Sequence, residues 1–455
     1  MFRKTWLLER TARRTALLLG AALFVGSAAH AQGDPEQRQV NTQNPGKRWQ
    51  EVARGREARS TRLAEALPGG FGGISINENG DAVVFLQDTT HAAAAHAAVA
   101  PLLRDRVRSR RSRGPAVPNI VVRRGEFAFG QLSGWRDQLT DPLMDIEGVE
   151  VVDLDERTNR IVVGISSDAA RAAAEQKASE LGAPAAALRF ERMTPFASDI
   201  RYLEERSPAD YFASLQGYNR PVRGGMLVSF ENAEAGRAAS CTLGVVAKIG
   251  GEATATHFLT NSHCTGINRE VGRAKYYQET IYPDRYIGYE SRDPAYTACG
   301  FLYSYKCRQS DAAAGRLDTA AGVTAGTLEF GYIARPLAGG SLTIDPNNPR
   351  FRISASGDVP WVGEYVDKVG AETGWTYGRL VQECVTVDLG SYRFYCQDLA
   401  TYGRASGDSG APVFLWNPDD TASFVGLHVG FNGDYAVYSP LFNIREDFGV
   451  QIQVH

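Results

Sequence analysis

The sequence has little net charge and lacks a long hydrophobic run beyond its N-terminal segment. Its 455 residues carry 49 Lys and Arg against 52 Asp and Glu, a net charge of -3. Without an overall basic field, nucleic acid is not expected as a main partner. Because no later run approaches about 18 apolar residues, we expect a soluble mature protein with no membrane anchor. With 43% hydrophobic and 22% charged residues, the composition is globular and excludes a collagenous, disordered or coiled-coil chain.

Cysteine is missing from the first 240 residues, and no Cys-x-x-Cys pair occurs in the chain. The six cysteines are Cys241, Cys264, Cys299, Cys307, Cys384 and Cys396. An even number of cysteines in an exported chain favours disulfides. A zinc site would be expected to show Cys-x-x-Cys pairs or the His-Glu-x-x-His motif, and the sequence has neither. We therefore expect no metal and no other cofactor.

The N-terminal 31 residues have the pattern of a secretory signal peptide. Basic residues between positions 3 and 14 precede an apolar stretch over residues 16–25, and Ala29-His30-Ala31 then supplies the small residues of a cleavage site. About ten apolar residues are too few to cross about 30 Å of hydrocarbon. We expect cleavage before Gln32 and a secreted protein, extracellular or periplasmic in transit.

The first half of the mature chain shows the same order of elements twice. A hairpin with an Asn-Gly turn at residues 77–80 and a helix over about 91–106 belong to a unit at about 71–135. A second hairpin, a helix over about 168–181 and a returning strand form a unit at about 148–195. Two successive hairpin–helix–strand units predict an α+β region of two small subdomains.

The remaining segments differ in character from these two units. Residues 32–70 are polar and predict a loose tail with one short helix, and the basic stretch 104–113 predicts a solvated loop rather than a nucleic-acid site. Residues 201–221 have the composition of a connector. From residue 220 onward, short strands separated by Gly, Asn and Asp turns predict an all-β sandwich or barrel, closed by a helix near residues 440–449.

The segment Ser406-Gly-Asp-Ser-Gly-Ala-Pro carries the strongest chemical signal. A serine between glycines in a tight turn, here Ser409, has an exposed hydroxyl, and its small neighbours allow a substrate carbonyl to approach. The same turn can direct the backbone N–H groups of Gly407 and Ser409 toward one point, as an oxyanion hole requires. About 145 residues upstream, His263 follows an apolar strand and precedes a cysteine. A histidine has the intrinsic pKa of a base that can activate a serine.

The chain from about residue 220 to residue 455 resembles the chymotrypsin-like serine proteases. The closest likeness is to the secreted bacterial alpha-lytic protease and streptogrisin type. It rests on the order of His263 and Ser409, on Arg223-Gly-Gly at the start, on Cys241 with Cys264 around the histidine turn, and on the closing segment 440–450. The resemblance implies two antiparallel six-stranded β-barrels and a secreted endopeptidase that works through a Ser-His-Asp triad and an acyl-enzyme.

The resemblance also assigns roles to further residues. Asp311 is the expected acid of the triad, with Asp318 as the second choice. The implied disulfides are 241–264, 299–307 and 384–396. Animal relatives bury a new N-terminal ammonium against the Asp before the nucleophile, here Asp408, but the sequence lacks the Ile-Val-Gly-Gly that this requires. The bacterial branch uses an internal basic residue, which makes Lys368 the candidate partner of Asp408.

Substrate preference is left open between two classes. Residues 402–404, at the expected floor of the specificity pocket, include no aspartate, which argues against a preference for Lys or Arg. In glutamate-specific members a histidine at the position of His428 contacts the substrate carboxylate, and Ser406 could assist it. A small or medium apolar side chain is the other candidate. The sequence also departs from the usual GDSGGP by carrying Ala411.

The place of the first half in the chain resembles that of a protease pro-region. Residues 32–219 are then expected to assist folding and to inhibit the enzyme until they are cleaved off, so that the partners are a protein or peptide substrate and the chain's own pro-region. The alternative is an exported, catalytically silent binding protein on a protease fold with a permanent N-terminal domain. In either case we expect a monomer.

Overall fold

The computed structural model describes residues 45–109, 119–198, 200–202, 213–232, 236–265 and 274–455. The predicted signal peptide and residues 110–113 of the predicted basic loop lie outside these residues. Residues 104–109 of that predicted loop are helical instead, because the helix that precedes them continues to Ser109. In the part of the chain that is described, no helix has the length and apolar character needed to cross a membrane.

The described chain begins with two helices, α1 (Pro45–Arg56) and α2 (Ala58–Ala66). Trp49, Val52 and Ala53 of α1 lie on one helical face and are buried. Trp49 stacks on Tyr395, with 5.5 Å between the ring centroids. The expectation of a loose tail with one short helix was therefore wrong, because the apolar face of α1 packs against a residue about 350 positions later in the chain, which a local pattern does not reveal.

The chain from residue 71 to residue 124 forms a hairpin, a helix and a third strand. The order is β1 (Phe71–Ile76), β2 (Ala82–Leu86), the short turn η2 (Thr89–His91), α3 (Ala92–Ser109) and β3 (Ile120–Arg124). The three strands form one sheet in the order β1-β2-β3, with β2 and β3 parallel. The turn at residues 77–80 forms as expected. The N–H of Asp81 donates to Asn77 Oδ1 at 2.9 Å, and Gly80 adopts a φ of 84°, which glycine tolerates.

The second unit repeats this order after a helix that the sequence analysis missed. Helix α4 (Phe129–Met144) precedes β4 (Val149–Asp155), β5 (Arg160–Ile165), α5 (Asp168–Glu180), η3 (Ala185–Ala187) and β6 (Leu188–Arg192). Two glycines and a proline within α4 weaken its helical signal, and its buried side chains, including Leu132 and Leu139, stabilise it through tertiary packing. Side chains from both units form one hydrophobic cluster.

The second half of the chain consists mostly of strands, as expected for a chymotrypsin-like β domain. One nine-stranded sheet runs in the order β27 (Ile452–Gln453), β12 (Val245–Ile249), β13 (His257–Asn261), β18 (Ala312–Leu317), β15 (Tyr286–Arg292), β14 (Lys275–Gln278), β10 (Leu227–Asn232), β11 (Arg237–Thr242) and β8 (Arg201–Tyr202). The helix α6 (Ser262–Thr265) directly follows β13.

A second sheet of 15 strands follows a longer path. Its order is β16 (Thr297–Cys299), β17 (Tyr305–Arg308), β23 (Tyr392–Ala400), β26 (Ala436–Pro440), β25 (Ala422–Phe431), β24 (Pro412–Trp416), β21 (Tyr365–Gly370), β22 (Gly374–Leu389), β4, β5 and β6. Off this path lie β7 (Ala197–Ser198), β9 (Val222–Gly224), β19 (Leu328–Ala334) and β20 (Arg350–Ser356). The closing helix is α7 (Leu441–Phe448), and short turns of helix are η4 (Pro283–Arg285), η5 (Phe301–Tyr303), η6 (Thr319–Ala321) and η7 (Ala325–Thr327). Closure into two six-stranded barrels stays a prediction.

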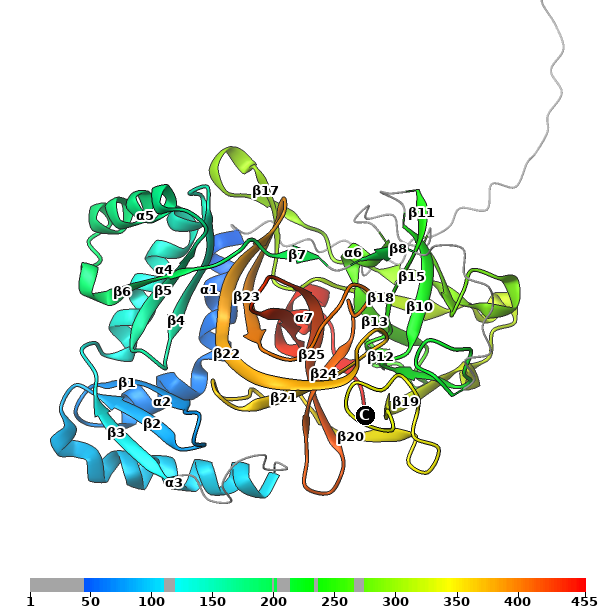
Figure 1. Cartoon of the computed structure of the whole chain (residues 1–455), viewed down its shortest axis with the longest axis horizontal. Coiled ribbons are helices and arrows are strands. Elements are labelled where there is room, and N and C mark those ends of the chain that lie inside the picture. Colours follow the sequence, from blue (N-terminus) through cyan, green and yellow to red (C-terminus); the bar gives the residue numbers. More distant parts are fainter. Residues whose placement is uncertain (1–44, 110–118, 199, 203–212, 233–235, 266–273) are drawn as a thin grey trace, which may run out of the picture. The chain divides into compact units, whose positions relative to one another are not determined.

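The long strand β22 joins the two halves of the chain. It curves from β21 to β4 (Figure 1), where Thr386 pairs with Val152 and Val387 with Val151 in antiparallel register. Two ion pairs add to this contact: Arg56 Nη2 lies 2.6 Å from an Asp398 carboxylate oxygen in a buried pair, and Arg393 Nη1 lies 2.9 Å from Oδ1 of the more exposed Asp145. The predicted pro-region thus shares both backbone pairing and charge pairing with the strands of the second half.

The raised pKa of Glu290 in β15 predicts that the free energy of unfolding decreases as the pH rises from about 4.5 to about 7. Burial raises the pKa of this carboxyl to about 7, with the negative charge of Asp293 adding to the effect. The folded state then binds more protons than the unfolded state in this window, so stability is greatest below it and decreases as pH rises. A shift of this size corresponds to about 3 kcal/mol as an upper estimate.

The measurement is urea unfolding at pH 5 and at pH 8, in a Ser409→Ala background that cannot digest itself. Glu290→Gln should reduce the fall in stability between the two pH values, because its amide does not titrate. Glu65→Gln, at an exposed position, is the matched control and should leave the fall unchanged. An equal fall in all three proteins would contradict the assignment to Glu290.

Candidate active site

Ser409 lies in a tight turn between β23 and β24 that only glycine can complete on its C-terminal side. Gly410 has a φ of 84°, and a Cβ atom there would lie 2.4 Å from both the carbonyl oxygen of Thr242 and Oγ1 of Thr260. The carbonyl oxygen of Ser409 accepts a hydrogen bond of 2.8 Å from the N–H of Thr242. The turn thus lies against β11 and β13. Strand β13 leads directly to the predicted histidine.

His263 and Asp311 come together because two neighbouring strands are antiparallel. Asn261 at the end of β13 pairs with Ala312 at the start of β18. The residues just beyond these ends, His263 and Asp311, are therefore adjacent in space although they are 48 positions apart in sequence. The register of one sheet ladder thus fixes the position of the acid relative to the histidine.

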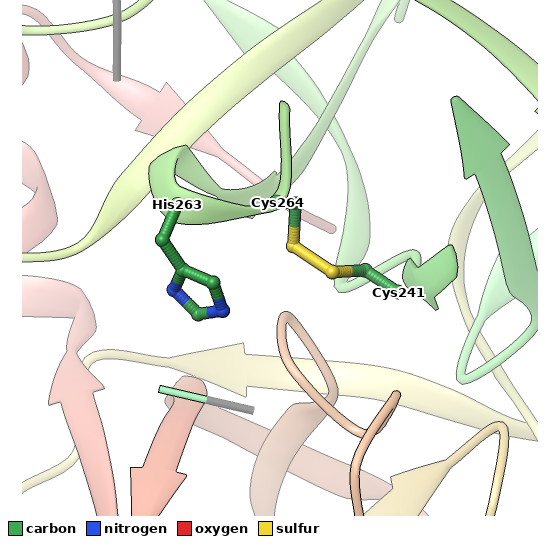
Figure 2. Close-up of side chains that lie close together, drawn as sticks. All are labelled: Cys241, His263 and Cys264. Atoms are coloured by element: carbon green, nitrogen blue, oxygen red, sulfur yellow. A yellow bond between two sulfur atoms is a disulfide. The ribbon is translucent and has the colours of Figure 1, made fainter. Parts of the chain in front are cut away.

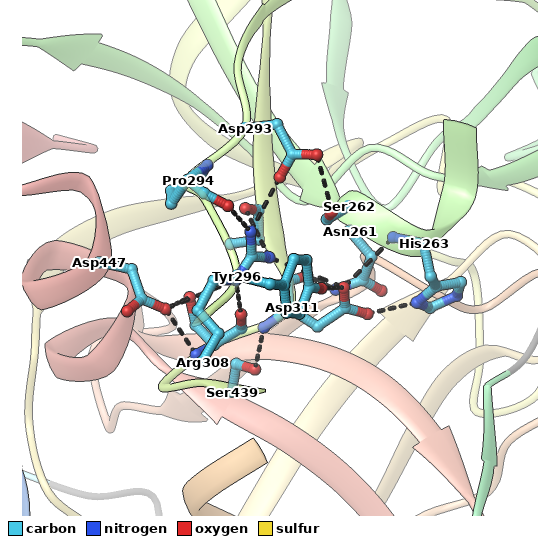
Figure 3. A network of polar contacts seen from close by, with 12 residues as sticks. Asn261, Ser262, His263, Asp293, Pro294, Tyr296, Arg308, Asp311, Ser439 and Asp447 are labelled. Carbon is cyan, nitrogen blue, oxygen red and sulfur yellow. Dashed lines mark hydrogen bonds and ion pairs between the residues drawn. The ribbon is translucent and has the colours of Figure 1, made fainter. Parts of the chain in front are cut away.

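The three predicted triad residues form a continuous chain of polar contacts. Nε2 of His263 lies 2.8 Å from Oγ of Ser409, and Nδ1 of His263 contacts the carboxylate of Asp311 (Figure 3). The N–H of His263 also donates to Asp311 Oδ1 at 3.2 Å. All three residues are buried, with exposed fractions of 7% or less. The expectation of an exposed Ser409 hydroxyl was therefore wrong, because β25 and the histidine ring lie against it. Ser409, His263 and Asp311 therefore have the connectivity of a nucleophile, a base and an orienting acid.

Asp318, the second choice for the acid, has a different place. Its carboxylate accepts from the N–H of Ala321, at 3.1 Å, and from the hydroxyl of Tyr286, at 3.0 Å. It thus caps the turn η6 at the far end of β18 from Asp311. Of the two candidate acids, the structure brings only Asp311 to the histidine.

A buried arginine supports the segment that carries Asp311, and the sequence analysis did not identify it. Arg308 donates from Nη1 to Asp293 Oδ1 at 2.9 Å and lies 3.9 Å from Asp311 Oδ1 (Figure 3). Asp447 of α7 accepts from the N–H of Ser310 at 2.7 Å. Burial raises the pKa of Asp293, and Arg308 counteracts this effect. These groups come from three separate segments, so no local motif could have revealed them.

Tyr296 and Ser439 complete the surroundings of Asp311. The hydroxyl of Tyr296 donates to Asp311 Oδ1 at 3.4 Å, and the N–H of Asp311 donates to Oγ of Ser439 at 3.0 Å. Asp311 is thereby held in one orientation toward the histidine ring.

A buried ion pair also stabilises the turn that carries Ser409. Nζ of Lys368 lies 2.6 Å from Asp408 Oδ2, and both side chains are fully buried. The predicted pairing of Lys368 with Asp408 is thus present in the structure. Asp408 further accepts hydrogen bonds from the N–H groups of Glu372 at 3.0 Å, Thr373 at 3.2 Å and Ala405 at 3.1 Å. Burial tends to raise the pKa of Asp408, but the charge of Lys368 and the hydrogen bonds outweigh it, so the pKa is lowered.

The cysteines are joined in the pairs that the resemblance implied, 241–264, 299–307 and 384–396. The first disulfide ties β11 to α6, immediately after His263 (Figure 2). Cys241, His263 and Cys264 lie close enough together to suggest a metal site. Because the two sulfur atoms bond to each other, neither is available as a thiolate ligand, so this group does not fit a metal.

The two residues predicted to bind substrate differ in their exposure. His428 of β25 is fully buried, and its Nδ1 lies 3.1 Å from the hydroxyl of Tyr402. Ser406 is exposed. The next residue after His428, Val429, offers its carbonyl oxygen to Oγ of Ser409 at 3.4 Å, so β25 passes directly beside the nucleophile. The roles of His428 and Ser406 in substrate binding stay predictions.

Comparison with known proteins gives structural likeness only. No family model and no curated protein sequence matches the chain. It is similar in structure to a glutamic acid-specific serine protease (20% identity, 51% of this chain and 100% of that one, TM-score 0.35). It is also similar to Thermobifida fusca protease A (18%, 51% and 99%, 0.34) and to an alpha-lytic protease homologue (21%, 50% and 97%, 0.33).

Half of the chain is thus similar to chymotrypsin-like bacterial serine proteases, as the sequence resemblance anticipated.

The ion pair beneath the nucleophile turn predicts a large loss of stability when one partner is removed. Lys368→Met leaves Asp408 buried without its counter-charge and should lower the free energy of unfolding by about 3–5 kcal/mol. Lys368→Met combined with Asp408→Asn removes both charges and should lose less than the single change. Urea unfolding in the Ser409→Ala background measures this, and an unchanged stability of Lys368→Met would contradict the role of the pair.

Proposed function

We propose that the chain is a serine endopeptidase that hydrolyses peptide bonds through an acyl-enzyme on Ser409. The observation that carries this proposal is the contact chain from Ser409 Oγ to His263 Nε2, at 2.8 Å, and from His263 Nδ1 to the Asp311 carboxylate. Isolating a carboxylate, an imidazole and a hydroxyl from water is costly unless they bind one another. Such a buried, mutually oriented set in one place is typical of a catalytic site.

The proposed mechanism follows from these contacts. His263 removes the proton of Ser409 as Oγ attacks the substrate carbonyl carbon, because the hydroxyl alone is a weak nucleophile. Asp311 keeps the proton of the ring on Nδ1 and stabilises the imidazolium that forms. The backbone N–H groups of Gly407 and Ser409 are the proposed donors to the developing oxyanion. His263 then gives its proton to the leaving amine, and water, activated by the same ring, hydrolyses the acyl-enzyme.

We further propose that the enzyme is made as a secreted precursor whose first half assists folding and inhibits until it is cleaved. Three disulfides support an oxidising compartment. The pairing of β22 with β4 and the ion pair of Arg56 with Asp398 support a folding role, because they stabilise strands of the second half that include the disulfide-linked Cys384 and Cys396. Residues 32–219 are the proposed pro-region.

The triad assignment predicts the activity of four variants. Ser409→Ala and His263→Ala should abolish hydrolysis, and Asp311→Asn should lower kcat by about 10⁴, the value known for the equivalent change in chymotrypsin-like enzymes. Asp318→Asn is the matched control and should retain activity, because Asp318 caps a remote turn. Turnover of a peptide library and labelling of Ser409 by a fluorophosphonate are the two readouts. Substantial turnover by Ser409→Ala would exclude the proposed mechanism.

The proposed folding role predicts that the second half alone does not reach the active state. The test fragment, residues 200–455, includes the last 20 residues of the proposed pro-region, so that it keeps strand β8 and Leu215, which is buried in the core of the second half. After denaturation and dilution, this fragment should regain fluorophosphonate labelling only when residues 32–199 are added as a separate chain. Full spontaneous recovery of the fragment would favour a permanent N-terminal domain instead.

A further inference from the structure

One buried cation lies among three carboxylates beside the proposed triad. Arg308, the last residue of β17, is 4% exposed, and the side chains of Asp293, Asp311 and Asp447 are each 6% exposed or less. Its Nη1 donates to Asp293 Oδ1 at 2.9 Å, its Nη2 lies 3.9 Å from Asp311 Oδ1, and its Nε lies 3.7 Å from Asp447 Oδ2. Carboxylates from three separate segments thus share a single positive charge (Figure 3).

Neutral groups also hold the guanidinium of Arg308 in place. It donates to the carbonyl oxygens of Pro294, at 2.5 Å, and of Ala312, at 3.2 Å. The ring of Tyr296 lies against it, with 4.3 Å between Cζ of the arginine and the centroid of the ring. A guanidinium does not lose its proton in a protein. The site therefore holds a permanent positive charge in a fixed place.

The two oxygens of the Asp311 carboxylate have different surroundings. Oδ2 contacts Nδ1 of the His263 ring. Oδ1 accepts from the hydroxyl of Tyr296 at 3.4 Å and lies 3.9 Å from Nη2 of Arg308 (Figure 3). Two cations that share one carboxylate disfavour each other. A proton on the ring is therefore less well stabilised than it would be without the guanidinium, although the arginine acts through Asp311.

Other titratable groups also face this part of the site. Glu290 of β15 accepts from the hydroxyl of Thr265 at 2.5 Å, and Asp293 accepts from that of Ser262 at 2.9 Å, so both hold the helix α6. Burial raises the pKa of Glu290 to about 7, so this carboxyl titrates in the range in which a histidine base works. Further titratable or charged groups in this part of the described chain are Tyr276, Tyr296, His428, Asp447, the pair of Lys368 with Asp408 and the pair of Arg201 with Glu372.

We propose that Arg308 is a positioning residue that holds Asp311 and offsets part of its charge, so that His263 stays available as a base at lower pH. The proposal rests on the proposed function of Ser409. Asp293 in turn offsets part of the charge of the guanidinium. The network around Arg308 thus sets the lower pH limit of the reaction, in addition to supporting the fold.

The experiment expresses the full chain for export and measures how fast a fluorophosphonate labels Ser409 in the secreted product. A serine attacks such a probe only when a base accepts its proton. The second-order rate constant, measured between about pH 4 and about pH 9, should therefore follow the fraction of His263 that is unprotonated. The quantity to compare is the pH at the midpoint of its acidic limb. Intact mass verifies a single adduct, which the Ser409→Ala variant should not form.

The expected shifts have opposite directions. Asp293→Asn removes a negative charge beside Arg308 and should move the midpoint down by about 0.5 pH unit. Asp293→Asn combined with Arg308→Gln removes the cation as well, and its midpoint should lie about one pH unit above that of Asp293→Asn. A merely structural loss would lower the rate constant without moving the midpoint in this order.

Variants of Arg308 alone provide a second comparison in which charge is the main difference. Arg308→Lys keeps the positive charge and should leave the midpoint within about 0.3 pH unit of the original, although it loses hydrogen bonds. Arg308→Gln should have a higher midpoint than Arg308→Lys. Urea unfolding of every variant in the Ser409→Ala background shows which of them are folded at the pH of the assay.

The matched control is the ion pair of Arg335 with Asp420, between the end of β19 and the turn before β25. Arg335→Gln combined with Asp420→Asn removes one charge of each sign, as the double variant at Arg308 does, and should leave the midpoint unchanged. The series is repeated with Glu290→Gln, in which that carboxyl no longer titrates, and the shifts should persist.

The outcomes separate this proposal from the proposed function. Equal midpoints for Asp293→Asn and the double variant, in proteins that are labelled on Ser409, would overturn the role of Arg308 and leave the enzyme. Shifts that vanish in the Glu290→Gln background would overturn it as well, because the titration would then belong to Glu290. A secreted product that is not labelled at any pH would overturn both proposals.

Discussion

The nucleophile turn depends on one buried charge pair. Asp408 precedes Ser409 at a fully buried position, and its charged carboxylate is stable there because Lys368 and several hydrogen-bond donors surround it. Those donors come from the turn itself and from the end of β21, so the pair fixes the backbone on which Ser409 stands. The contacts that neutralise the Asp408 carboxylate therefore also hold the backbone that positions Ser409 relative to His263.

The same site is completed by segments that are far apart in the sequence. One ladder, between β13 and β18, brings His263 to Asp311, and a disulfide holds the histidine turn to β11. The short strands β7 and β8 pair with β25 and β11, and each of these two longer strands also contacts Ser409.

Sequence patterns predicted the elements that local chemistry specifies. The Asn-Gly hairpin and the helix α5, capped by Ser167, follow from turn and capping preferences of nearby residues. Helices α1 and α4 were missed because they are stabilised by distant packing, as the stacking of Trp49 on Tyr395 shows. In the site, a short motif identified Ser409, whereas Arg308 and Asp447 gave no signal, since their partners lie on other strands.

The sequence by itself indicated a candidate nucleophile and a candidate base, because glycines around a serine and a histidine after an apolar strand have that meaning locally. Only the tertiary structure showed that Asp311, the expected acid, rather than Asp318 meets the histidine, and that β7 pairs with β25, the strand whose Val429 contacts Ser409. The reason is physical: strand register and the burial of charges depend on contacts between distant parts of the chain, and these contacts have no counterpart in the local sequence.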